Sequence, residues 1–231
     1  MKKTISLVSI VFSFFLLMLP ASLSAQKKVY TKSMRMQDFK SRTTMVVLSG
    51  PAIRDAALRA EVTSRWSVSP YAFCTPAEYE KLKSDPERYF LHTQKERGVL
   101  FLTLSKGGDP DSEDTMKKPL DIVSMPFCGE FDESGREAVY LPAYLSILQD
   151  FVEAALDSET KAYMGLKGIT RKLPKRWKLY EFPDEADRAF KDREPHSAVT
   201  VIISPDGAGA SKPRYKMTID TEDYSLYHYG K

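Results

Sequence analysis

The chain has 231 residues, of which 42% are hydrophobic, and a formal net charge of +3. This length and composition exclude a fully disordered chain and are sufficient for one hydrophobic core. Lys2 and Lys3 belong to an N-terminal segment that we expect to be removed. The remaining chain has 32 basic and 31 acidic residues, which gives a net charge of +1. A basic field over the whole molecule, of the kind that attracts nucleic acid, is therefore excluded.

Residues 1–25 have the pattern of a secretory signal peptide. The positive charges of Lys2 and Lys3 are followed by an apolar stretch over residues 5–19 and by small residues up to Ala25. The apolar stretch is shorter than the ~20 residues that a membrane-spanning helix needs, which makes a retained anchor the less favoured alternative. We therefore expect an exported bacterial protein, periplasmic or extracellular, with no transmembrane anchor after cleavage.

The first part of the mature chain predicts an arm, a strand and a helix. Residues 26–42 are polar and basic, which is typical of an N-terminal arm or a lead-in strand. Residues 43–49 are β-branched and apolar, as in a buried strand, and Gly50 and Pro51 end this run. Pro51 suits the first turn of a helix. The expected apolar face of that helix consists of Ile53, Ala57, Ala60, Leu58 and Val62.

A second strand and a second helix follow. Residues 68–74 form an apolar run that predicts a strand, and Pro70 within it favours an edge position in the sheet or an early kink. Thr75 and Glu78 have the spacing of a capping box, with Pro76 at the first helical position. A strand, a helix and a further strand in this order predict crossover connections between parallel strands.

The middle of the chain predicts a hairpin, a further strand and a long helix. Residues 88–94 and 98–105 form the expected hairpin, and residues 119–128 return as a strand after an acidic loop. The helix is expected from Leu141 towards Tyr163, with an apolar stripe at Tyr144, Leu148, Phe151 and Ala155. The predicted fold class is α/β, with α+β as the alternative: one mixed-sheet domain with two crossover helices and one long packed helix.

The predicted organisation divides the mature chain into four segments. Residues 26–42 are the arm and residues 43–166 the mixed α/β core. Residues 167–198 form a basic linker with a short helix near residues 184–192. Residues 199–231 form a C-terminal β-hairpin, which we expect to pack on the same domain.

Cys74 and Cys128 are the only cysteines, and two interpretations of them remain open. Export to an oxidising compartment favours a disulfide. If the strands that carry them lie at opposite edges of the sheet, however, the sulfurs are out of reach and both residues are free, buried thiols. Pro70 favours the second interpretation, because it marks its strand as an edge. A catalytic pair is the least favoured reading, since the spacing is not CxxC.

A basic and aromatic segment is the candidate binding site. It contains Lys172, Lys175, Arg176, Trp177, Lys178 and Tyr180. Such side chains can hold an acidic envelope component or another protein by charge and stacking. A solvated linker after a helix is the more ordinary explanation.

No residue receives a catalytic or metal-binding role from the sequence. The three histidines (His92, His196 and His228) have no zinc spacing, and the acidic loop at residues 109–114 lacks the glycine of a calcium loop. We therefore expect no cofactor and no metal. The main hypothesis is a non-catalytic binding or accessory module of the cell envelope. The alternatives are a hydrolase-type enzyme, with its site at the carboxyl ends of the parallel strands, and a purely structural interaction protein.

Overall fold

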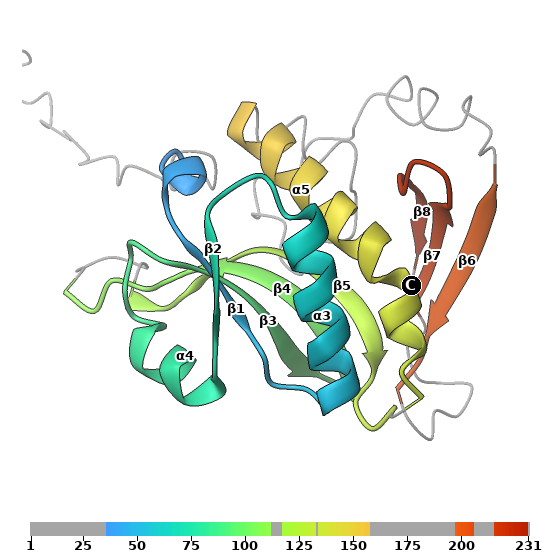
Figure 1. Cartoon of the computed structure of the whole chain (residues 1–231), viewed down its shortest axis with the longest axis horizontal. Helices are drawn as coiled ribbons and strands as arrows, with labels where there is room; N and C mark the ends of the chain where they lie inside the picture. Colours follow the sequence, from blue (N-terminus) through green and yellow to red (C-terminus); the bar gives the residue numbers. More distant parts are fainter. Residues whose placement is uncertain (1–35, 112–116, 133, 158–196, 206–214, 231) are drawn as a thin grey trace, which may run out of the picture. The chain divides into compact units, whose positions relative to one another are not determined.

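The computed structural model describes residues 36–111, 117–132, 134–157, 197–205 and 215–230 (Figure 1). The expected signal peptide, the basic linker with its short helix, and the last turns of the expected long helix lie outside these residues. Within the described residues, no helix has the length and apolarity needed to cross a membrane.

The centre of the fold is a mixed five-stranded sheet, which confirms the predicted α/β class. Its order is β2-β1-β3-β4-β5. The strands are β1 (Thr44–Val47), β2 (Tyr71–Cys74), β3 (Tyr89–Glu96), β4 (Val99–Lys106) and β5 (Leu120–Gly129). β1 pairs in parallel with β2 and β3, whereas β4 is antiparallel to β3 and β5. The carboxyl ends of β1, β2, β3 and β5 therefore lie at one edge of the sheet, which we call the carboxyl edge.

Helices cover both faces of this sheet. Consecutive strand residues point to opposite faces. Val46 belongs to the cluster that includes helices α3 (Ala52–Arg65) and α5 (Leu141–Asp157). Its neighbours Met45 and Val47 belong to the second cluster, where helix α4 (Pro76–Leu82) contributes Tyr79. The helices α3 and α5 thus lie together on one face and α4 lies on the other (Figure 1).

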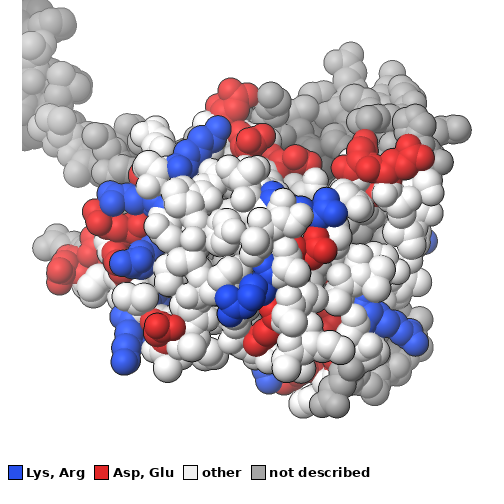
Figure 2. All heavy atoms as spheres, in the orientation of Figure 1, with Lys and Arg blue, Asp and Glu red and all other residues white. Residues whose placement is uncertain are grey.

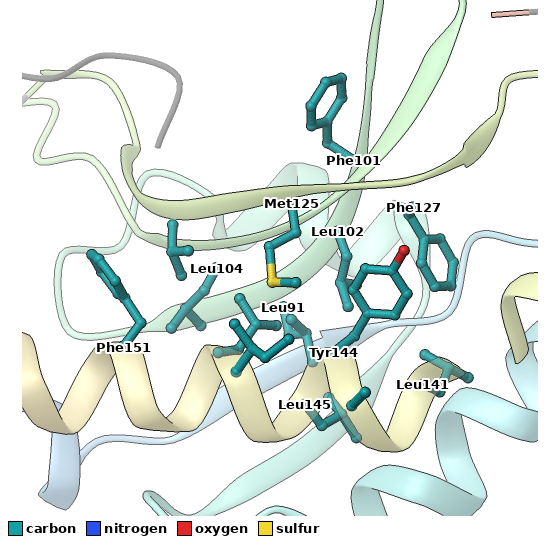
Figure 3. Close-up of a cluster of buried hydrophobic side chains, with 14 of the residues drawn as sticks. Leu91, Phe101, Leu102, Leu104, Met125, Phe127, Leu141, Tyr144, Leu145 and Phe151 are labelled. Carbon is teal, nitrogen blue, oxygen red and sulfur yellow. The ribbon is translucent and has the colours of Figure 1, made fainter. Parts of the chain in front are cut away.

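The long helix α5 fills the centre of the core, as its apolar stripe predicts. Tyr144, Leu148, Phe151 and Ala155 are all buried. Figure 3 shows side chains of β4 and β5 pointing towards α5, whereas Phe101 projects from the other side of its strand. The rings of Phe127 and Tyr144 meet edge to face, with centroids 5.3 Å apart. Sheet and helix therefore share one close-packed interior.

The buried face of α3 differs from the prediction. Leu58 and Val62 are buried as expected, but Ile53 is 71% exposed and Ala60 is also exposed. Arg54, which is not part of the expected apolar face, is buried together with Leu58 and Val62. The physical reason is a counter-charge from a distant loop, Glu137, which lets a guanidinium occupy an interior position.

Local signals were accurate at α4 and at the hairpin. The Thr75 hydroxyl accepts a hydrogen bond from the Glu78 N–H at 3.3 Å, and the Glu78 carboxylate accepts one from the Thr75 N–H at 2.7 Å, a complete capping box. In the β3–β4 turn, Arg97 (φ 53°) and Gly98 (φ 79°) are both left-handed. This backbone suits a two-residue hairpin.

The N-terminal part of the described chain is neither a strand nor a loose arm. Residues 36–38 form a turn and Phe39–Ser41 a short 3-10 helix, η1, with Met36 and Phe39 buried in the core. Asp38 accepts hydrogen bonds from the Tyr89 hydroxyl at 2.6 Å and from Lys106 Nζ at 2.8 Å. These contacts fix the segment to β3 and β4.

The C-terminal region forms three strands, one more than the predicted hairpin. They are β6 (Ala198–Ile203), β7 (Tyr215–Asp220) and β8 (Leu226–Gly230), in the order β6-β7-β8. The extra strand arises because residues 221–225 form a turn, with Tyr224 left-handed (φ 60°). Tyr215 packs edge to face on Phe101 of β4, with ring centroids 5.4 Å apart.

Candidate functional site

The carboxyl edge is the part of the fold where a site is expected on topological grounds. In open α/β sheets, ligands bind outside the carboxyl ends of strands, where the connections of neighbouring parallel strands diverge. β1 lies between β2 and β3. After β1 the chain continues through α3 to β2, whereas after β3 it continues through a hairpin turn to β4, so the two connections diverge between β1 and β3. At this point the hydroxyls of Ser49 and Thr93 are 3.1 Å apart.

The loop after β1 is held against the first turn of α3. The Gly50 N–H donates to Asp55 Oδ1 at 2.9 Å. A Cβ on Gly50 would lie 3.0 Å from Arg54 Cδ and 3.1 Å from the Asp55 carboxylate, so a larger residue would press on both side chains. The helix begins after Pro51 without a side-chain cap. The loop and the helix start therefore form one tightly fitted unit.

A buried ion pair joins this unit to the β5–α5 loop. Arg54 Nε donates to Glu137 Oε1 at 2.6 Å, and the two side chains are only 9% and 2% exposed. Arg54 Nη2 also donates to the Asp132 carbonyl at 3.0 Å. Glu137 Oε2 has no hydrogen-bond partner among the described residues. The pair therefore fixes the position of the loop, while both of its charges are withdrawn from solvent.

Large apolar side chains are exposed around this buried pair. Ile53, Phe131 and Val139 are 71%, 75% and 74% exposed. They come from the first turn of α3, from the turn after β5, and from the 3-10 helix η3 (Arg136–Tyr140). The loop lies close to the first turn of α3, since a Cβ added to Gly135 would be 3.7 Å from Ile53 Cγ2. Exposed apolar side chains gathered in one region are typical of interaction surfaces.

Basic side chains are the most exposed charges in the same region. Lys95, Arg97 and Arg136 are exposed. Lys95 extends from β3 and forms an ion pair with Glu130 at 3.1 Å, in which the carboxylate is 22% exposed and the lysine 67%. The Glu130 N–H donates to the Gly98 carbonyl at 3.0 Å, so the hairpin turn adjoins the loop after β5.

Three acidic residues of this region, Asp55, Glu130 and Asp132, are partly buried, and their carboxylates accept bonds from other groups of the protein. Asp55 accepts from Gly50, and Asp132 Oδ1 accepts from the Ser134 N–H at 2.9 Å. Hydrogen bonds from Ser134 lower the pKa of Asp132 below its ordinary value. Glu133 lies outside the described residues. We call the region formed by the three apolar and three basic side chains, Ile53, Phe131, Val139, Lys95, Arg97 and Arg136, the carboxyl-edge face.

Among the described residues in the orientation of Figure 2, no extended area carries charges of one sign only. Basic and acidic side chains alternate over the face shown there, between large areas without charge. This distribution agrees with the nearly balanced composition of the chain. Recognition by charge therefore depends on local groups.

A second polar cluster lies on the α4 face of the sheet. His92 Nε2 is 3.1 Å from Ser105 Oγ, and Gln94 Nε2 donates to Asp121 Oδ1 at 3.1 Å. The ring of Tyr79 stacks on His92 with centroids 5.0 Å apart. A serine and a histidine within hydrogen-bond distance are the arrangement that an activated nucleophile requires.

This cluster does not present its serine to a substrate. Ser105 is 0% exposed and His92 is 4% exposed. A nucleophile must reach the reacting carbon, so Ser105 cannot act in this conformation. The cluster is better explained as a network of buried polar groups that satisfy one another.

Cys74 and Cys128 are both buried, and they form no disulfide with each other. Cys74 ends β2 and Cys128 lies in β5, and these strands form the two edges of the five-stranded sheet. Four strand spacings of ~4.8 Å separate the edges, which is far beyond the reach of a disulfide. Burial and the charge of Glu78 raise the pKa of the Cys74 thiol, which makes it a poor nucleophile at neutral pH.

The sequence did not identify the residues of the carboxyl-edge face. Lys172, Lys175, Arg176, Trp177, Lys178 and Tyr180, the predicted binding residues, lie outside the described residues. Two features of the sequence could have pointed to the face. One is the four-residue spacing of Arg54, Leu58 and Val62, which places them on one row of a helix. The other is Phe131, a lone aromatic residue within an acidic turn segment.

No group of three or more histidine, cysteine or acidic side chains among the described residues is placed to hold a metal ion. Comparison with protein-family models, with curated proteins and with solved structures finds no match to this chain.

Proposed function

We propose that the chain is an exported, non-catalytic binding module of the cell envelope, periplasmic or extracellular, and that the carboxyl-edge face is its binding surface. One observation carries this proposal: at the carboxyl edge the carboxylates of Asp55 and Glu137 are engaged internally, while three large apolar side chains are exposed to solvent. Acid–base catalysis requires an ionisable group that can reach a substrate, whereas recognition requires exposed anchors.

The rigidity of the face supports a binding role. Arg54 and Glu137 fix the β5–α5 loop on α3, and Glu130 fixes it on the β3–β4 turn. A surface that is already ordered loses little conformational entropy on binding. Phe131 and Arg136 are also residue types that are enriched in the centres of interfaces.

The experiment is capture of partners from a solubilised cell-envelope fraction with the immobilised chain from Gln26 onwards. The test variant is Phe131→Ser with Val139→Ser, and the matched control is Ile202→Ser, because Ile202 is a similarly exposed residue (62%) on β6. We expect the wild type and the control to retain the same component and the test variant to lose it.

A second variant examines the basic segment by changing Lys172, Lys175, Arg176 and Trp177 to alanine. If capture is lost in this variant and kept in Phe131→Ser with Val139→Ser, the binding surface is the basic segment and the assignment to the carboxyl-edge face is wrong. If neither variant nor the wild type captures a component, the binding proposal itself is contradicted.

A further inference from the structure

We propose that β6 pairs edge to edge with β6 of a second copy of this chain, which joins two three-stranded sheets into one continuous sheet. β6 is the first strand in the order β6-β7-β8, so one of its sides is paired with β7 and the other is an edge of the sheet (Figure 1). Such an edge presents backbone donors and acceptors that another extended strand can satisfy. It is a different surface from the carboxyl-edge face, and the pairing does not depend on the proposed function.

The register with β7 shows which backbone groups of β6 lie at the outer edge. The Thr221 N–H donates to the Ser197 carbonyl at 2.8 Å, and opposite residues of antiparallel strands alternate between bonded and non-bonded pairs. Every second residue of β6, beginning with Val199, therefore bonds to β7. The residues whose N–H and C=O groups point away from β7 are Ala198, Thr200 and Ile202. Among the described residues, none bonds to these outward backbone groups.

The edge formed by β6 lacks the features that usually protect a free edge. Proline, charged side chains, bulges and short length prevent the addition of further strands. β2 has four residues and follows Pro70, β5 contains Pro126 and two register shifts with β4, and β8 has a register shift with β7. β6 contains neither proline nor a charged residue, and its pairing with β7 is regular over all six residues. Of the described edges, this one remains open to a further strand.

The strand is complementary to a reversed copy of itself. In an antiparallel pair centred on Thr200, this residue lies opposite Thr200 of the second copy, and Ala198 lies opposite Ile202. All outward N–H and C=O groups of the two copies then bond to each other. Ile202, which is 62% exposed, would be placed beside the small side chain of Ala198, and the half-buried Val199 would lie opposite Val201. Cross-strand pairs of this kind stabilise a sheet.

A second copy is the occupant that the side chains favour. β6 carries no charge, so two identical strands do not repel each other. A strand of another protein could satisfy the same backbone groups, but the match of large to small side chains is already present in β6. A two-fold pair is closed, so the assembly stops at two copies. Two six-residue strands cover little area, and we therefore expect a weak dimer that depends on concentration.

The test is sedimentation equilibrium of the chain from Gln26 onwards at concentrations up to ~1 mM. This chain keeps every described residue and omits the apolar N-terminal stretch, which could associate by itself. Thr200→Lys and Thr200→Glu are measured separately and as an equimolar mixture. The matched control is Thr63→Lys, the same substitution at an exposed threonine of α3. Thermal unfolding of each variant establishes that it is folded.

We expect the wild type and Thr63→Lys to dimerise equally. Thr200→Lys alone and Thr200→Glu alone should each weaken association by about tenfold or more, because like charges then face each other across the pair. The mixture of the two variants should restore association, because opposite charges meet. Ile202→Ser should also weaken the dimer, and it should leave envelope capture unchanged because capture uses the carboxyl-edge face.

Three results would overturn the pairing: a wild type that stays monomeric up to ~1 mM, equal association of the wild type and the folded Thr200→Lys variant, or a mixture of the two charged variants that associates no more than either alone. If the wild type is monomeric and envelope capture is lost in Thr200→Lys, a strand of another protein occupies the edge, and the second copy is the wrong occupant.

Discussion

Replacing Glu137 by glutamine should destabilise the protein strongly, although the side chain keeps its shape. The substitution leaves the Arg54 guanidinium buried, at 9% exposure, without its counter-charge. Two unit charges about 4 Å apart interact by roughly 4 kcal/mol at the effective dielectric constant of partly buried sites. Removal of one partner of a buried pair accordingly costs about 3–5 kcal/mol.

The double replacement Arg54→Met with Glu137→Met should cost less stability than Arg54→Met alone or Glu137→Met alone. It removes both charges together and fills the space with apolar atoms, and such exchanges are often nearly neutral. Glu137 Oε2 lacks a hydrogen-bond partner among the described residues, so the native pair is itself imperfectly compensated. We therefore expect the two sites to be coupled by about 2–4 kcal/mol.

Urea unfolding followed by circular dichroism measures these free energies. The control is Glu80→Gln, which breaks the surface ion pair between Glu80 and Lys83. Their side chains are 61% and 40% exposed, so this substitution should cost less than about 1 kcal/mol of stability. A cost below about 1 kcal/mol for Glu137→Gln, or a double variant that simply adds the two single effects, would refute the reasoning.

Three further predictions concern other parts of the fold. Gly107→Ala should destabilise the protein by more than about 1 kcal/mol in urea unfolding, because its Cβ would overlap the backbone carbonyl of Asp85. Gly50→Ala is the milder comparison, because its Cβ would meet side-chain atoms at 3.0 Å or more and no backbone atom, and equal effects of the two substitutions would contradict the packing argument. Thiol titration without reductant should find two reactive cysteines in denaturant and slow reaction in the native protein, whereas no reactive thiol in denaturant would indicate a disulfide. The third prediction concerns pH. Burial alone would raise the pKa of Asp38, but hydrogen bonds from Lys106 and Tyr89 outweigh it and lower the pKa. The stabilisation by this carboxylate is therefore present above the unfolded pKa, near ~3.9, and lost as the pH falls towards the folded pKa. Acid unfolding should show a smaller loss of stability over this range in Asp38→Asn, and an unchanged pH profile would contradict the assignment.

The elements that were predicted correctly have local causes. The capping box at Thr75 and Glu78 lies within four residues, and the stripe on α5 is a pattern within one helix. The edge position of β2 followed from Pro70, because proline cannot donate to a sheet ladder. Such signals need no knowledge of the rest of the chain.

The features that were missed depend on distant partners. The expected apolar face of α3 did not include Arg54, because a guanidinium is buried only when a counter-charge is supplied. That charge comes from Glu137, 83 positions away in the sequence. The two readings of the cysteines differed only in strand order, which local patterns do not determine. The third C-terminal strand depends on a turn at residues 221–225 within one polar and aromatic run.

From the sequence, only the site of the alternative, a hydrolase-type enzyme, was expected at the carboxyl ends of the parallel strands, and the binding site was expected in the basic segment. The exposed apolar side chains of the carboxyl-edge face were not predicted. Phe131 and Val139 belong to a loop whose course is fixed by contacts with α3 and with the β3–β4 turn. Their exposure is a property of that tertiary arrangement, and an isolated aromatic residue in the sequence indicates it only weakly.

The most direct test of the carboxyl-edge face is backbone amide hydrogen exchange of the chain from Gln26 onwards, with and without isolated cell-envelope membranes. This measurement reports which part of the chain is covered, whatever the partner is. We predict slower exchange in peptides spanning residues 48–54 and 129–140, and no such protection in the Phe131→Ser, Val139→Ser variant. Protection confined to residues 167–180, or no protection anywhere, would contradict the account.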